Sequence, residues 1–243
     1  MIKDALFLVV VFLTNAIQCI TGFAGTVLAM PFSIKLLGYD IAKPILNVLG
    51  LLASVWVVCF NFKKINVKEL IKIVAVMTAG MVGGIFLKKC FDGNPGLLYK
   101  LLGLIVIVFS VVFAVKFYMK KEDKEMSGFV AYPLLIVSGV VHGMFVCGGP
   151  LLVTYANAKL KDKDEFRATL SASWILLNGI IAVTDFYDGL FTVPTLKLLA
   201  VSVAVLAAAL VAGNLVYKKL SRNVFLQLTY ILMFISGVSL LIK

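Results

Sequence analysis

Long apolar runs separated by short polar stretches dominate the chain. Six of these runs have the length of about 20 residues that a helix needs to cross a bilayer. They occupy residues 41–61, 70–87, 97–118, 166–184, 194–217 and 224–242. Short charged segments such as FKKINVKEL and MKKEDKEMSG separate them and leave no room for a soluble domain. The pattern predicts an all-α polytopic membrane protein.

Two further apolar runs, 5–37 and 129–158, are too long for one span and too short for two. Both are interrupted by small residues, in ITGFAGTVLAMPF and in HGMFVCGGPLLV. We therefore expect helix breaks near Gly22–Thr26 and Cys147–Pro150. Pro150 suits the first turn of a new helix, where its missing N–H costs nothing. Non-helical backbone at membrane depth must be buried in protein or line a cavity, so the two breaks should meet inside the bundle.

The two broken runs also resemble each other. Shifting the chain by 124 residues superimposes the breaks and places Gln18 on His142. This predicts an internal duplication, with one transmembrane repeat in residues 1–120 and the other in 121–243, inside a single integral membrane domain. Chance similarity between apolar helices is the alternative.

Composition supports the membrane class and changes the meaning of the net charge. The chain is 62% hydrophobic and 14% charged, whereas a soluble domain is about a quarter charged. A net charge of +11 would suggest nucleic-acid binding in a soluble protein. Here the Lys and Arg residues cluster between apolar runs, as the positive-inside rule describes, so we expect a lipid bilayer and no nucleic acid as partner.

The 23 Lys and Arg residues also distinguish two topologies. Eight simple spans would place 12 of them on one side and 11 on the other. If both broken runs are re-entrant hairpins, the division becomes 8 and 15, which obeys the positive-inside rule. Each half then has a hairpin plus three transmembrane helices, and the odd number makes the halves inverted repeats. Eight spans, two of them broken, remain the alternative.

The preferred topology gives the chain an orientation in a plasma or inner cell membrane. Both termini lie outside, and the loops in the cytoplasm are 63–72, 116–127, 159–167 and 218–222. The N-terminal stretch MIKDALFLVVVFLTN lacks a convincing small-residue cleavage site. We therefore expect it to be retained as the first membrane segment.

The breaks themselves are candidate binding sites for an anion. Each second arm should begin a helix at the break, with free N–H groups and the positive end of its dipole pointing into a cavity. The residues concerned are Gly25, Thr26, Gly148, Gly149 and Leu151. Glycines that merely allow close helix packing are the alternative.

His142 is the chain's only histidine, and we expect it to be the main ionisable group inside the spans. Ser138 shares its helical face, and Gln18 occupies the equivalent position in the first repeat. Histidine exchanges a proton near neutral pH, which makes His142, with Gln18, a candidate for proton coupling. A neutral histidine bonded to a helix carbonyl is the alternative.

Polar residues recur at steps of seven in both halves, which keeps them on one helix face. They are Asn47, Ser54 and Asn61 in the first half, and Ser171, Asn178 and Asp185 in the second. We interpret Asn47, Ser54, Ser171 and Asn178 as ligands of a substrate. Interhelical hydrogen bonding is the alternative, and we favour it for Asn61 and Asp185.

Other features predict packing rather than chemistry. Gly80–Gly84 fits small-residue helix packing, and Trp56 and Trp174 fit positions facing lipid or the interface. The four cysteines lack CxxC spacing and the single histidine has no acidic cluster near it, so we expect no metal site and no cofactor. No motif of a soluble catalytic domain occurs, and we expect the chain not to be an enzyme.

The quoted stretches resemble a known family. ITGFAGTVLAMPFSIKLLGYDIAKPILNVLGLLAS and SGVVHGMFVCGGPLLVTYANAKLKDKDEFRATLSASWILLN resemble the two repeats of the sulfite exporter TauE/SafE family of membrane permeases. The first stretch departs from the family in GFAGT, where a richer glycine cluster is common, and in PILN, where Ala-Thr is usual.

The resemblance implies transport of sulfite or related sulfur-containing or organosulfonate anions without ATP, by rocking of one repeat against the other. An anion channel or a non-transporting membrane subunit is the alternative. A membrane enzyme that uses the Cys147 thiol is a third and weaker hypothesis. The sequence leaves open whether the chain forms a homodimer.

Overall fold

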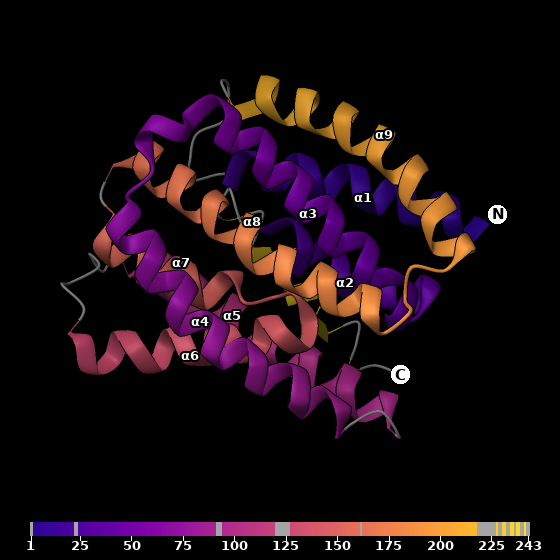
Figure 1. The fold of residues 1–243 in the computed structure, drawn as a ribbon, viewed down its shortest axis with the longest axis horizontal. Coiled ribbons are helices and arrows are strands. Elements are labelled where there is room, and N and C mark those ends of the chain that lie inside the picture. Colours follow the sequence, from indigo (N-terminus) through magenta and orange to yellow (C-terminus); the bar gives the residue numbers. More distant parts are fainter. Residues whose placement is uncertain are drawn as a thin grey trace.

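Helices account for all regular structure that the computed structural model describes, as the sequence predicts (Figure 1). The structure describes residues 2–21, 24–90, 94–119, 127–160 and 162–217, together with single positions between 227 and 241. No strand occurs in these ranges.

The helices follow one another along the chain with short connections. They are α1 (Ile2–Thr21), α2 (Ala24–Leu37), α3 (Tyr39–Asn61), α4 (Val67–Lys89), α5 (Pro95–Tyr118), α6 (Gly128–Phe145), α7 (Gly149–Lys159), α8 (Lys163–Tyr187) and α9 (Val193–Tyr217). A 3-10 turn, η1 (Phe62–Lys64), joins α3 to α4. The predicted run 224–242 lies largely outside the described residues.

Seven of the described helices are long and apolar enough to cross a membrane: α1, α3, α4, α5, α6, α8 and α9. Large apolar side chains such as Phe86, Phe129 and Val201 are exposed on their outer faces. In water this surface would be unfavourable, whereas lipid tails solvate it. The chain is therefore a multi-pass membrane protein, as predicted.

The polar segments between the apolar runs begin several of these helices. Asn66, Asn94 and Asp162 precede α4, α5 and α8, and each side chain accepts a hydrogen bond from a backbone N–H of the first turn. Such caps satisfy N–H groups that have no partner inside the helix. The interruptions in the apolar pattern therefore predicted the helix starts well.

Three pairs of helices organise the bundle (Figure 1). α3 packs against α8 in the middle, α1 packs against α9 on one side, and α4 packs against α6 on the other. In the predicted duplication, α4 corresponds to α9 and α6 to α1. Each of the two flanking pairs would then combine one helix from each half, in equivalent positions. The duplication and the inversion of its halves stay predictions.

Glycines bring α4 and α6 into backbone contact. A Cβ atom added to Gly80 would lie 2.1 Å from the carbonyl oxygen of Ile136, and one added to Gly139 would lie 2.2 Å from that of Met77. Gly84 makes an equally close approach. Small residues let the backbones of membrane helices approach closely, so the predicted packing role of Gly80–Gly84 is confirmed.

α2 and α7 are the short members of the set, with 14 and 11 residues. At 1.5 Å per residue they measure about 21 Å and about 16 Å, less than the bilayer's hydrocarbon thickness of about 30 Å. Each follows directly after a helix of spanning length, and each packs against it. The two broken runs of the sequence are thus two helical hairpins with one short arm each.

Candidate functional site between the helix breaks

The chain leaves helical geometry between α6 and α7, as predicted. α6 ends at Phe145, the left-handed Val146 has φ 57° and ψ 28°, and α7 begins at Gly149. The backbone N–H of Val146 donates to the carbonyl of His142 at 2.7 Å. Pro150 lies in the first turn of α7, in its predicted place. A left-handed β-branched residue is uncommon, so surrounding contacts must hold this break.

Ser138 and Gly148 supply those contacts. The Ser138 hydroxyl donates to the carbonyl oxygen of Gly148 at 2.8 Å. A Cβ atom added to Gly148 would lie 2.4 Å from the carbonyl oxygen of Ser138 and 2.8 Å from Cβ of His142. Glycine at this position therefore lets the break fold back onto α6, which is the packing role considered for these glycines.

The first hairpin has a similar close approach. α1 ends at Thr21 and α2 begins at Ala24, while residues 22–23 lie outside the described part of the chain. A Cβ atom added to Gly25 would lie 2.1 Å from Oε1 of Gln18. Gly25 thus lets the start of α2 pack directly against the Gln18 side chain.

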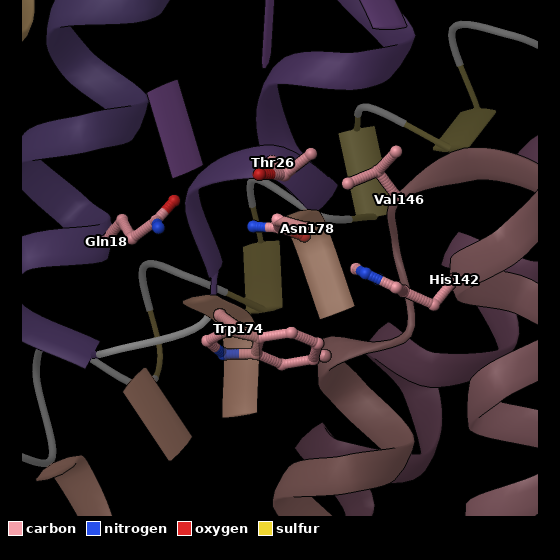
Figure 2. Close-up of a pocket in the computed structure, with 7 residues that line it drawn as sticks. Gln18, Thr26, His142, Val146, Trp174 and Asn178 are labelled. Carbon is pink, nitrogen blue, oxygen red and sulfur yellow. The ribbon is translucent and has the colours of Figure 1, made fainter. Parts of the chain in front are cut away.

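A cavity lies where the two breaks meet (Figure 2). The Cys147 sulfur is 4.0 Å from the carbonyl oxygen of Thr26, so the second break contacts the first. The cavity is lined by Gln18, Thr26, His142, Val146, Gly149, Trp174 and Asn178. Five of these were predicted as site residues from the sequence: Gln18, Thr26, His142, Gly149 and Asn178.

The cavity lies half-way along the two central helices. A Cβ atom added to Gly50 would lie 3.2 Å from Nδ2 of Asn178 and 3.4 Å from Oγ1 of Thr26. Gly50 is near the middle of α3, and Asn178 is near the middle of α8. Thr26, by contrast, belongs to the first turn of α2. Both hairpins therefore place their breaks at mid-length of the long central helices.

Several polar atoms at the cavity have no hydrogen-bond partner within the described residues. They are both ring nitrogens of His142, Nε1 of Trp174 and Oδ1 of Asn178. The Asn178 side chain lies beside the His142 ring without reaching hydrogen-bond geometry (Figure 2). The alternative for His142, a hydrogen bond from its ring to a helix carbonyl, does not occur among the described residues. Unpaired buried polar groups are costly, which points to a ligand or water as their partner.

The cavity is small in this conformation. Its volume is about 20 Å³. That volume admits water, since about one water-sized sphere is enough. A larger ligand would require the lining side chains or the two breaks to move apart.

The two predicted polar stripes face each other across α3 and α8. Nδ2 of Asn47 donates to the backbone carbonyl of Asn178 at 3.0 Å, while Oδ1 of Asn47 has no partner among the described residues. Ser54 is buried and donates to the carbonyl of Gly50, in its own helix. Ser171 is buried on the same face of α8 as Asn178. The stripes therefore lie inside the bundle rather than against lipid.

Six predicted site residues do not line the cavity: Gly25, Asn47, Ser54, Gly148, Leu151 and Ser171. Three of them contact its lining, because Gly25 packs on Gln18, Gly148 on His142 and Asn47 on Asn178. The described contacts of Ser54 and Ser171 do not reach the residues that line the cavity.

Trp174 is a residue that sequence reasoning placed wrongly. It is 5% exposed and lines the cavity, with its ring centroid 5.1 Å from that of His142. The expected position facing lipid is right only for Trp56, which is 43% exposed. The available signal was the spacing of Trp174 from Ser171 and Asn178, three and four residues away on the same helical face.

Two further polar contacts between the halves were missed. Lys43, near the start of the predicted span 41–61, is buried and forms an ion pair with the buried Asp185 at 2.5 Å. His142 is thus not the main ionisable group inside the bundle, although the interhelical role favoured for Asp185 is right. Nη2 of Arg167 donates to the carbonyl oxygen of Cys19 near the end of α1, at 2.8 Å.

Comparison with known proteins covers almost the whole chain. Residues 7–240 match the family described as Sulfite exporter TauE/SafE, a range that includes α2 to α9, most of α1 and every residue lining the cavity. No curated protein and no solved structure matches the chain. Since the matched range far exceeds half the sequence, the resemblance carried by the two broken segments is confirmed, and the chain belongs to the sulfite exporter TauE/SafE family.

Proposed function

We propose that the protein is a secondary transporter of small sulfur-containing anions, with sulfite as the first candidate. Its family implies a membrane transporter of sulfur anions rather than an enzyme. The observation that carries the proposal is the cavity between the two helix breaks, which combines a helix N-terminus with unpaired polar side chains. The substrate would bind there, half-way along α3 and α8.

The donors for an anion would come from backbone and side chains together. α7 begins at the cavity, and no side chain caps its first turn. The N–H groups of Gly149 and Leu151 and the positive end of the helix dipole would therefore face the ligand. Nε1 of Trp174 and the amide group of Asn178 would complete the set, while Asn47 would hold α8 in place through its bond to the Asn178 carbonyl.

The arrangement of the hairpins supports the predicted architecture of two inverted repeats, 1–120 and 121–243. Half-length arms whose breaks meet at mid-length of the spanning helices are what re-entrant segments require. The flanking pairs α1·α9 and α4·α6 fit a two-fold relationship between the halves. In this topology the protein sits in the cell membrane with both termini outside, and a cysteine placed in the 119–127 loop would react only with reagents from the cytoplasm.

Transport would require the small cavity to open alternately to the two sides. Counterflow in proteoliposomes tests this: internal unlabelled sulfite should accelerate the uptake of labelled sulfite. Rapid dissipation of the gradient without exchange acceleration would indicate a channel.

Thermal stabilisation of the purified protein by sulfite, thiosulfate, sulfonates and carboxylates would rank the substrates, and no stabilisation by any anion would contradict the site. Light scattering of the same preparation would measure the molecular mass and so distinguish a monomer from a homodimer.

A further inference from the structure

A buried ion pair joins the two central helices. Nζ of Lys43 in α3 lies 2.5 Å from Oδ1 of Asp185 in α8. The two side chains are 8% and 0% exposed. Oδ2 of Asp185 is buried and has no hydrogen-bond partner in the described ranges. The carboxylate therefore pairs with the lysine ammonium through Oδ1, while Oδ2 is an acceptor without a donor among the described residues.

The pair lies on the same helix faces as the cavity. Lys43 precedes Asn47 by one helical turn, and Asp185 follows Asn178 by two turns, or about 10 Å along α8. The charge of Lys43 also acts on His142, which lines the cavity. Because a lysine ammonium sits on a flexible four-carbon stem, it can turn from Asp185 toward the cavity.

Stability alone does not account for this pair. Replacing a buried ion pair by well-packed apolar residues is often neutral or stabilising, and ionisable side chains inside membrane helices are costly. The residues that line the cavity include no permanent positive charge. A bound anion would therefore need a cation from outside the lining, and the buried Lys43 is such a group.

We propose that the transported anion replaces Asp185 as the ion-pair partner of the Lys43 ammonium, and that Asp185 takes up a proton in the same step. Before binding, the ammonium neutralises the carboxylate; after binding, it neutralises the anion and the carboxyl group is uncharged. For a monovalent anion the number of buried charges stays at two, and one proton travels with each anion. This rests on the proposed function and names its coupling ion and the residue that carries it.

The other charged groups around Asp185 fit this role less well. Lys88 of α4 and Asp188 at the end of α8 interact electrostatically with Asp185. Asp188 is exposed, so water solvates its carboxylate and no ion-pair partner is needed. The Lys88 ammonium lies 5.3 Å from the centroid of the Tyr39 ring. Asp188→Asn and the exposed Lys35→Gln are therefore matched controls for the two members of the pair.

The test is the pH dependence of thiosulfate binding to purified protein, because the charge of thiosulfate is constant between about pH 6 and about pH 8. If one proton binds with each anion, the Kd of the unmodified protein rises about tenfold per pH unit. Asp185→Asn, which mimics the protonated acid, should bind thiosulfate with a Kd independent of pH. Lys43→Gln should weaken binding at least about tenfold at every pH. Both controls should behave as the unmodified protein does.

A double variant covers the case in which a single change prevents folding by leaving one buried charge unpaired. Lys43→Gln/Asp185→Asn keeps a neutral hydrogen bond and should fold, bind weakly and show no pH dependence. A pH slope that persists in Asp185→Asn and disappears in His142→Gln would overturn the proposal in favour of His142. Thiosulfate binding of unmodified strength in the double variant would also overturn it. If the unmodified protein binds thiosulfate but no variant changes the slope, only this inference fails; if it binds no anion, the proposed function fails as well.

Discussion

The rings of His142 and Trp174 lie with their centroids 5.1 Å apart and their planes inclined by 36°, although α6 and α8 reach this point from different parts of the chain. Neither ring has a hydrogen-bond partner for its polar nitrogens in the described residues. Two aromatic rings with unused polar groups form one wall of the cavity. A ligand bound in the cavity should therefore contact these two rings and change their environment.

Tryptophan fluorescence can report that binding. In a Trp56→Phe background, Trp174 is the remaining tryptophan of the chain. Sulfite or thiosulfate should change its emission in a saturable manner, because a charge would come close to the indole N–H. Trp174→Ala should raise the Kd about tenfold, the loss of roughly one charge-assisted hydrogen bond. The reciprocal Trp56→Ala protein, altered only at a lipid-facing side chain, should keep its affinity; if it loses as much, the assignment of the cavity is wrong.

Asn178 distinguishes a site for anions from a site for cations. Asn178→Asp puts a carboxylate at the cavity with nearly the same shape, and repulsion at close range should weaken anion binding at least about a hundredfold. Asn178→Ala, which only removes a donor, should cost about tenfold. Isothermal titration with thiosulfate measures both. The control is Asn61→Asp, which should leave the thiosulfate affinity unchanged, because the Asn61 side chain donates to Val57 in its own helix. Unchanged thiosulfate affinity in Asn178→Asp would contradict an anion site at this cavity.

The contact between α4 and α6 can be tested with two glycines of one helix. Gly80→Ala would place a methyl group against the carbonyl oxygen of Ile136, so we expect a loss of about 1–3 kcal/mol in the free energy of unfolding. Gly83→Ala meets nothing within 4 Å and should be neutral or stabilise the helix by up to about 1 kcal/mol. Unfolding in mixed micelles measures both variants. Equal destabilisation by the two would refute the close approach.

Ser138 should matter for the shape of the break more than for overall stability. Ser138→Ala removes the hydrogen bond to the Gly148 carbonyl, at a cost of about 1 kcal/mol, and lets the start of α7 shift relative to the cavity. Exchange of labelled sulfite should fall several-fold. Ser202→Ala is the control, since that hydroxyl donates to Leu198 within its own helix. Unchanged exchange in the Ser138 variant would mean that the break holds its shape without this bond.

The sequence predicted the breaks and the buried stripes because both depend on local pattern. Closely spaced glycines, followed by a proline in the second run, favour a helix break locally, and polar residues at steps of seven share a helix face. His142 was found because it is the chain's only histidine and lies in an apolar run, and Gln18 because the 124-residue shift places it on His142. These features need no knowledge of which helices become neighbours.

What the sequence could not supply was the pairing of distant residues. Lys43 lies four residues after Tyr39, the first residue of α3, and its partner is 142 positions away, so nothing local distinguishes it from a loop lysine. Trp174 was misplaced because a large aromatic side chain is equally common against lipid and inside a bundle. Both errors were resolved only by the packing of α3 against α8.

The glycine contact between α4 and α6 bears on how such a protein could move. Two helices whose backbones touch along a ridge of carbonyl oxygens cannot slide or tilt past each other without collision. Yet α4 comes from the first half of the sequence and α6 from the second. α1 and α9 also pack across the halves, where a Cβ atom added to Gly213 would lie 2.7 Å from the carbonyl oxygen of Ala16. If the protein works as the proposed transporter, the parts that move would then not be the two predicted repeats. They would be mixed units, one built on α4 with α6 and the other on α1 with α9, and the motion that opens the cavity would take place between them.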